Sequence, residues 1–229
     1  MKKNQASGMS SIQYKSLSES LTEQLRELII IGEFEPGRHL TETEIAQNMG
    51  VSRIVVREAM IILIREGLLV KKPNKYTSVV EFNAKDIEEI FDLRIAIEET
   101  ASKFCIGNSE FIAELNDRCK AIKDLSVQKG SSTIEIMKAD MAFHTYIVQS
   151  AQNSRILKVW KEDIYGAMLL LLYRYIEADH RQPLSHDELI HAFEHGNSND
   201  IQRGILLHIE DTKKKLINIA SSEKYTFKD

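Results

Sequence analysis

The chain has 229 residues, of which 43% are hydrophobic and 28% charged, proportions that are typical of a globular protein and exclude a disordered or fibrous one. Its net charge of −4 at pH 7 argues against a DNA-coating protein of the nucleoid type, which predicts a much more basic chain. The two cysteines, Cys105 and Cys119, cannot build a disulfide framework, so we expect buried, reduced thiols.

The N-terminal segment and the apolar runs indicate a cytoplasmic protein. Residues 1–13 carry charge but lack the apolar core of a secretory signal, and we expect them to form a flexible tail. The longest apolar run, residues 167–173, is far shorter than the roughly 20 residues that a membrane-spanning helix needs. We therefore expect no association with a membrane.

Residues 14–81 show the pattern of a small domain with three helices and a β-hairpin. Leucines and isoleucines first recur at helical spacing, and a segment with Pro36 and Gly37 interrupts them. Thr41 and Ser52 are residue types that begin helices, and Gly50 is of a type that ends them. We expect helices at residues 15–29, 41–49 and 52–65, and strands at residues 68–71 and 77–81.

The two helices on either side of the turn at Gly50 form a helix-turn-helix pattern. Arg53 and Arg57 are four residues apart, so they project together from one helix face while the aliphatic residues of that helix face a core. In a recognition helix the early residues meet base edges and basic neighbours hold phosphates. The alternative is a small helical domain with exposed arginines. The shared core is expected to contain Ile45, Met49, Val51, Val56 and Ala59.

Residues 82–86 are the expected linker to a second domain, residues 87–229, which has no strand pattern. Six helices without intervening strands predict an antiparallel bundle. The whole chain is therefore predicted to be mainly α, with a winged helix-turn-helix followed by an all-helical bundle. The expected helices span residues 84–104, 109–128, 133–151, 154–177, 185–195 and 198–220.

An aspartate and three histidines lie among apolar residues on faces that would point into this bundle. Asp140 and His144 are four residues apart on one predicted helix, while His186 and His208 belong to two later helices. A buried carboxylate is costly unless a positive charge compensates it. One carboxylate and three imidazoles suit a divalent transition metal such as Zn, Ni or Mn. The alternative is a set of core residues that satisfy one another without a metal.

Arg94 lies at the edge of a further apolar stripe, which we expect to contain Ile90, Leu93 and Ile97. Its simplest role is a surface ion pair with Glu98, one helical turn further on. An arginine that points into a helical pocket, by contrast, requires a carboxylate partner.

The segment "LRELIIIGEFEPGRHLTETEIAQNMGVSRIVVREAMIILIREGLL" resembles the winged-helix domain of GntR-type bacterial transcription regulators. The resemblance implies that Arg53 and Arg57 contact double-stranded operator DNA, with Ser52 and Ile54 nearby. It also implies a wing that approaches the minor groove, where Lys75 is expected to meet a phosphate.

Residues 84–229 resemble the all-helical C-terminal effector domain (FCD) of the FadR branch of this family, closest to its six-helix, VanR-like group. The resemblance implies that Arg94 clamps a carboxylate of a small effector with a bidentate contact. Asn153 and Arg174 are weaker candidates for lining the same pocket. The four metal ligands of the family pattern correspond to Asp140, His144, His186 and His208.

Together these features predict a ligand-responsive bacterial regulator, most simply a repressor. The family resemblance implies a homodimer that reads a palindromic operator and responds to a small carboxylic acid at a metal-containing pocket. The alternative is a metal-dependent, hydrolase-like enzyme with a DNA-binding appendage. No convincing general base or nucleophile accompanies the predicted ligands, so we expect the chain not to be an enzyme.

Overall fold

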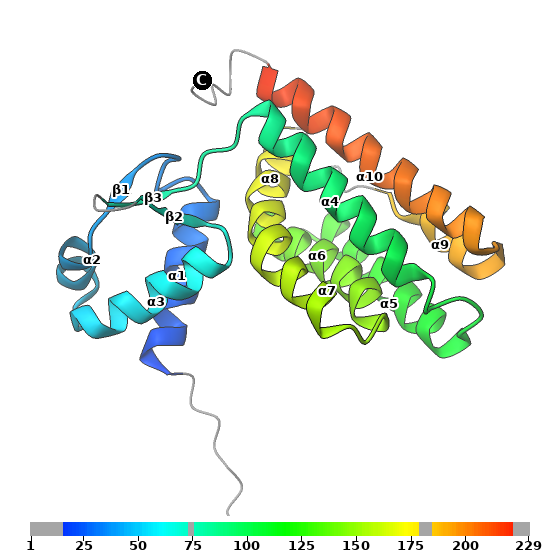
Figure 1. The fold of residues 1–229 in the computed structure, drawn as a ribbon, viewed down its shortest axis with the longest axis horizontal. Helices are drawn as coiled ribbons and strands as arrows, with labels where there is room; N and C mark the ends of the chain where they lie inside the picture. Colours follow the sequence, from blue (N-terminus) through cyan, green and yellow to red (C-terminus); the bar gives the residue numbers. More distant parts are fainter. Residues whose placement is uncertain (1–15, 73–75, 179–184, 222–229) are drawn as a thin grey trace, which may run out of the picture.

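The computed structural model describes residues 16–72, 76–178 and 185–221, and it shows two parts that pack against each other (Figure 1). The first part contains α1, α2, α3 and a small sheet, and the second contains the helices from α4 to α10. This arrangement confirms the predicted mainly helical fold. None of the helices in the described ranges is long and apolar enough to cross a membrane.

The first part contains the predicted three helices and hairpin, with one strand more than the sequence indicates. β3 is the central strand of an antiparallel sheet, with β2 on one side and the short β1 on the other. The register pairs Leu69 with Val79 and Lys71 with Thr77. The elements are α1 (Leu17–Ile30), β1 (His39–Leu40), α2 (Glu42–Met49), α3 (Arg53–Arg65), β2 (Leu69–Lys71) and β3 (Thr77–Val79).

Local signals in the sequence fix the turn between α2 and α3. The Thr41 side chain accepts a hydrogen bond from the Glu44 amide at 3.2 Å, and Ser52 caps α3 in the same manner. Gly50 ends α2 with a φ of 65°, a left-handed conformation that glycine adopts without steric cost. Ile45, Val56 and Ala59 of the predicted core are buried, and Met49 and Val51 pack against them while partly exposed.

The second part is built entirely from helices, and α4 and α10 lie side by side along it (Figure 1). Asparagine or serine residues cap several of these helices, and apolar faces meet in a core around Trp160 and Phe143. Cys105 and Cys119 are buried free thiols, and burial raises the pKa of Cys105 to about 11. The helices are α4 (Ala84–Ser102), α5 (Ser109–Val127), α6 (Thr133–Ser150), α7 (Ser154–Val159), α8 (Tyr165–Ala178), α9 (Asp187–His195) and α10 (Ser198–Ser221).

The helix expected at residues 154–177 contains a π-helical turn, η1 (Trp160–Ile164), between α7 and α8. Trp160 is fully buried there, and its Nε1 donates a hydrogen bond to Thr145 of α6 at 2.9 Å. The π-helical turn therefore packs directly against the helix that carries Asp140 and His144.

The two parts meet where the C-terminal end of α3 lies against the junction of η1 and α8. Gly166 approaches so closely that a Cβ atom there would lie 1.9 Å from the carbonyl oxygen of Glu66. The Glu66 side chain accepts two hydrogen bonds of 2.8 Å from Arg26 of α1. A second link joins Lys138 of α6 to Glu27 of α1 at 3.0 Å. The C-terminal end of α3 thus contacts the helical part directly.

Candidate functional site

The exposed face of α3 carries the residues predicted to meet DNA. Ser52, Arg53, Ile54 and Arg57 are all exposed, whereas the opposite face of the helix is buried against α1 and α2. The first turn of α3 therefore presents two guanidinium groups and one large apolar side chain to the solvent. Lys75 lies outside the described residues.

Glu42, at the start of α2, holds both arginines in this structure. Its carboxylate accepts two hydrogen bonds of 2.8 Å from Arg57 and a longer one, at 3.4 Å, from Arg53. The hydrogen bond from Arg57 is the main cause of a lowered pKa for Glu42. Because all three groups are at least partly exposed, this contact orients the guanidinium groups more than it stabilises the fold.

A groove of about 660 Å³ lies between α3 and the β2–β3 hairpin. Arg53 and Arg57 line one side, and Lys71 and Lys72 line the other. Tyr76 closes one end by stacking on His39, with ring centroids 3.6 Å apart. Four cations around one groove form a surface that suits a polyanion.

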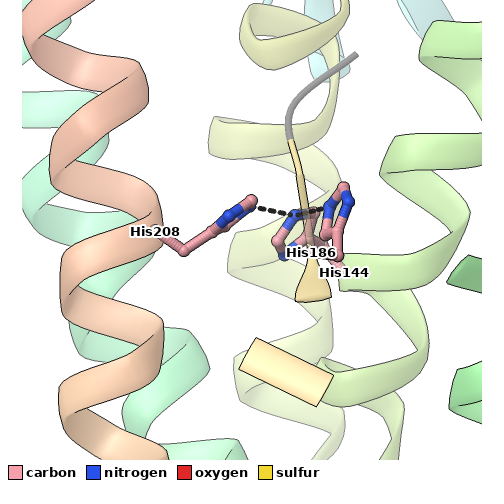
Figure 2. A group of neighbouring side chains, drawn as sticks. All are labelled: His144, His186 and His208. Atoms are coloured by element: carbon pink, nitrogen blue, oxygen red, sulfur yellow. Dashed lines mark hydrogen bonds between the residues drawn. The ribbon is translucent and has the colours of Figure 1, made fainter. Parts of the chain in front are cut away.

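In the helical part, three predicted ligands meet at one point (Figure 2). His144 projects from α6, His186 precedes α9, and His208 projects from α10. The Nε2 atom of His144 lies 3.3 Å from the Nε2 atoms of both other rings, and all three candidate ligand atoms lie within 4.8 Å of one another. Nitrogen ligands at 2.0–2.1 Å from a tetrahedral ion stand about 3.3–3.4 Å apart, so the observed spacing fits such an ion.

Asp140 lies beside this group of histidines, one helical turn before His144. Its Oδ1 lies 3.2 Å from His186 Nε2, while its buried Oδ2 has no hydrogen-bond partner among the described residues. An unsatisfied buried carboxylate oxygen is costly unless a cation or another donor meets it. We therefore refer to Asp140, His144, His186 and His208 as the candidate metal centre.

Glu98 of α4 fixes the orientation of His144. Its Oε2 lies 2.7 Å from His144 Nδ1, and its Oε1 accepts a hydrogen bond of 2.7 Å from Arg94 Nε. A carboxylate beside Nδ1 keeps the proton on that nitrogen, which leaves Nε2 with a free lone pair toward the cluster. Sequence reasoning considered Glu98 only as a surface partner of Arg94. The sequence feature that could have identified Glu98 as an interior residue is its position, one helical turn after Arg94 and one turn before Ala101, which is buried.

Burial and charge act together on the ionisation of the candidate metal centre. Burial and the nearby Arg94 charge lower the pKa of His144, and burial followed by the neighbouring imidazoles lowers the pKa of His208 well below its usual value. Burial alone would raise the pKa of Asp140, but His186, His144 and Arg94 together outweigh burial and the pKa falls. The same competition lowers the pKa of Glu98, where His144 and Arg94 outweigh burial. The lowered pKa values favour neutral imidazoles at His144 and His208 and ionised carboxylates at Asp140 and Glu98, which are the protonation states that bind metal ions.

Arg94 lies inside the bundle and not at its edge. It is 1% exposed, its Nη1 approaches the Met168 sulfur at 3.9 Å, and its Nη2 has no partner among the described residues. The predicted pair with Glu98 exists, but it is buried and not on the surface. The prediction that Leu93 belongs to the buried stripe is wrong, since Leu93 is 39% exposed. The interior is polar at this level, so the arginine and not the leucine faces inward.

The two weaker pocket candidates belong to the start of α7 and to α8. Asn153 is exposed and caps α7, because its side-chain oxygen accepts hydrogen bonds from the amides of Arg155 and Ile156. Arg174 is half-buried on α8. Nothing in the described part of the chain joins Asn153 to the candidate metal centre. Glu42 and Glu98 are the residues that sequence reasoning did not assign to a site, and both act by holding other side chains.

Comparison with known proteins assigns both parts to described families. Residues 17–79 match the pattern of bacterial regulatory proteins of the gntR family, and residues 89–211 match the FCD domain. An uncharacterized HTH-type transcriptional regulator of Bacillus subtilis, YdhC, is 27% identical over 206 residues, which cover 88% of this chain and 91% of that protein. A gluconate operon transcriptional repressor of Bacillus licheniformis is 31% identical, covering 66% of this chain and 63% of that protein.

Solved structures agree with this assignment at the level of the fold. The structure of E. coli McbR/YncC superimposes with a TM-score of 0.71 at 20% identity, covering 90% of this chain and 99% of that chain. The relatives are transcription regulators and not enzymes, so the hydrolase alternative does not apply. The chain belongs to the gntR family of bacterial transcription regulators and carries an FCD domain.

Proposed function

We propose that this regulator binds operator DNA through α3 and the adjacent wing, and that a metal ion and a small carboxylic acid in the helical part control this binding. Arg53 and Arg57 would contact base edges or phosphates, with Ser52 and Ile54 beside them and Lys75 on the wing. The exposed guanidinium groups and the groove with Lys71 and Lys72 support this assignment.

The candidate metal centre would hold a divalent transition metal such as Zn, Ni or Mn. One observation carries this proposal: three imidazole nitrogens converge beside the buried carboxylate of Asp140, whose Oδ1 lies 3.2 Å from His186 and whose Oδ2 has no hydrogen-bond partner among the described residues. When bound, the metal would supply Lewis-acidic coordination positions to a ligand carboxylate. Asp140, His144, His186 and His208 would hold the metal, and Glu98 would orient one of the imidazoles.

Arg94 would hold the effector carboxylate. Its buried Nη2 is unpaired among the described residues, which is costly for a charged group and is relieved by an anionic ligand. One relative is named for a gluconate operon, and gluconate is a sugar acid with a carboxylate and hydroxyl groups. Asn153 and Arg174 would make secondary contacts with the effector. Asn153 is the weaker candidate of the two, because its side chain already caps α7.

We further propose that the chain acts in the cytoplasm as a homodimeric repressor on a palindromic operator, with residues 14–81 and 87–229 as its domains. Relatives named as repressors support the sign of regulation. Two copies of α3 one helical turn of DNA apart would read equivalent half-sites.

Elemental analysis of protein purified without chelator tests the metal. We expect close to one equivalent of Zn, Ni or Mn, and its loss from His208→Ala, because three remaining ligands hold an ion less well. The matched control is His191→Ala, which removes an exposed histidine of α9 and should leave the metal content unchanged. Equal metal content in parent and His208→Ala would refute the assignment.

Operator binding is tested by selecting duplexes from a random DNA pool with the metal-loaded protein. The selected operator is then titrated with short hydroxy acids, dicarboxylates and sugar acids. We expect one class to weaken binding, and expect stripping of the metal to abolish that response. No enrichment from the pool would reject operator binding, while enrichment without any carboxylate response would reject only the effector.

A further inference from the structure

Ile54 is the most conspicuous apolar residue on the proposed DNA-binding face. It is the second residue of α3 and is 70% exposed. The residues of α3 that build the core, Val56, Ala59 and Leu63, lie on the other side of the helix. Packing within the described structure therefore does not account for an isoleucine at this position.

Helix stability does not account for it either. A β-branched residue is a poorer helix former than alanine, because its side chain loses rotamer freedom against the neighbouring turn. The caps of α3 are supplied by other groups, since the Ser52 hydroxyl accepts a hydrogen bond from the Val55 amide. An exposed isoleucine at the start of this helix is thus slightly unfavourable for the isolated chain.

The neighbours of Ile54 indicate what it meets. It lies next to Arg53 in the chain and one helical turn before Arg57, so the three side chains emerge together from the start of the helix. Ile61, two turns after Ile54, is 43% exposed and lines the groove beside Arg57. An exposed apolar side chain beside two guanidinium groups matches a surface that is anionic overall but has a local apolar group.

The major groove of DNA has one such group. Phosphates and the acceptor atoms of guanine attract the arginines, and the C5 methyl group of thymine is the apolar feature that base edges present there. A β-branched side chain is well suited to this contact, because its restricted χ1 leaves little conformational entropy to lose on binding. We infer that Ile54 is a specificity-determining residue that contacts a thymine methyl group in each operator half-site, at a base pair adjacent to the one met by Arg57. The inference rests on the proposed operator binding and identifies one base of each operator half-site as thymine.

Replacement of single thymines by deoxyuridine tests the inference, because this change removes the methyl group and leaves base pairing intact. The operator selected by the parent protein is synthesised with deoxyuridine at each thymine position in turn. At one position in each half-site, we expect the parent to bind about fourfold more weakly, which is the effect of exposing one methyl-sized group.

The variant Ile54→Ala should bind the thymine and deoxyuridine operators equally at that position, with an affinity near that of the parent for an operator that carries deoxyuridine at this position in both half-sites. Val127→Ala is the matched control, since Val127 is an even more exposed aliphatic residue at the end of α5. It should keep the parent's discrimination. Circular dichroism confirms that both variants fold.

Two outcomes overturn the inference while leaving operator binding intact. The parent could bind every deoxyuridine operator as tightly as the thymine operator. Alternatively, Ile54→Ala could keep the parent's preference for thymine, which would assign the methyl contact to another residue. Failure of the parent to select any operator would instead remove the proposed function on which the inference rests.

Discussion

Glu98 Oε2 lies 2.7 Å from Nδ1 of His144, and both side chains are completely buried. This contact joins α4 to α6 and determines which nitrogen of His144 faces the candidate metal centre. It also connects that centre to Arg94, because the other oxygen of the same carboxylate accepts from the guanidinium group. The proposed metal ligand His144 and the proposed effector-binding residue Arg94 thus share one buried carboxylate.

The first prediction concerns this shared carboxylate. Glu98→Gln keeps the size of the side chain but removes the negative charge that holds the proton on His144 Nδ1. We expect the affinity for the metal to fall about tenfold to a hundredfold, the usual effect of losing a group that orients a ligand. Competition with a chelator of known affinity measures the change.

Glu99→Gln is its control, because Glu99 is the neighbouring, half-buried glutamate on the same helix. It should bind metal as the parent does. If Glu98→Gln retains the parent's metal affinity, Glu98 does not orient a ligand, and its burial has to be explained by the ion pair with Arg94 alone.

The second prediction concerns the recognition arginines. Arg57→Ala should weaken operator binding by roughly fivefold to a hundredfold, since it removes a base or phosphate contact. If the contact is to a phosphate, the slope of log affinity against log salt should also decrease by about one. Fluorescence anisotropy at several salt concentrations measures both quantities.

Arg65→Ala serves as the comparison, because Arg65 is an exposed arginine in the last turn of the same helix and does not line the groove beside the hairpin. Arg65→Ala changes the net charge by the same amount as Arg57→Ala. Similar losses for the two variants would mean that general electrostatic attraction, and not a specific contact of Arg57, explains the effect.

Periodicity and capping residues were sufficient to predict most helices of this chain. Thr41, Gly50 and Ser52 placed the turn of the helix-turn-helix, because each acts within one helical turn of its own position. The side-chain pattern also indicated that Asp140 and His144 face the interior, as they do.

The parts that could not be predicted depend on contacts between distant segments. Leu93 and Arg94 are adjacent on α4, and hydrophobicity favours burial of the leucine. The structure buries the arginine, because Glu98, Met168 and the candidate metal centre create a polar interior at that level. The π-helical turn at Trp160 similarly depends on its contacts with α6 and α3, which no local pattern encodes.

The third prediction concerns the contact between the two parts of the chain. Gly166→Ala would place a Cβ atom 1.9 Å from the Glu66 carbonyl oxygen, so the end of α3 has to move away from α8. We expect the free energy of unfolding to fall by about 1–3 kcal/mol, with faster hydrogen exchange in the turn after α3 and in η1. Mass spectrometry of exchanged peptides locates the change.

Gly204→Ala in α10 is the matched control. The nearest atom to a Cβ there is the Ala192 side chain at 3.2 Å, a much longer distance than the one at Gly166, and alanine is the better helix former. Exchange near Glu66 should then be unchanged. If hydrogen exchange near Glu66 is as slow in Gly166→Ala as in the parent, the two parts separate readily and this contact is not maintained in solution.

The fourth prediction separates two roles of Arg94. Replacement of Arg94 by alanine would leave the buried charge of Glu98 with His144 as its remaining partner and would damage the fold, so the informative substitution is Arg94→Lys. Lysine keeps the charge beside Glu98 but cannot reproduce a planar bidentate contact with a carboxylate. If Arg94 holds the effector, the effector concentration needed to release the operator should rise about tenfold to a hundredfold, as expected for the loss of a charge-assisted hydrogen bond. Metal content and operator affinity without effector should remain near those of the parent.

If Arg94 only positions Glu98, the variant should instead lose metal affinity in the manner of Glu98→Gln, while the midpoint of the effector response at saturating metal stays unchanged. An effector titration of the preformed protein–operator complex, at saturating metal and with chelator competition in parallel, distinguishes the two results.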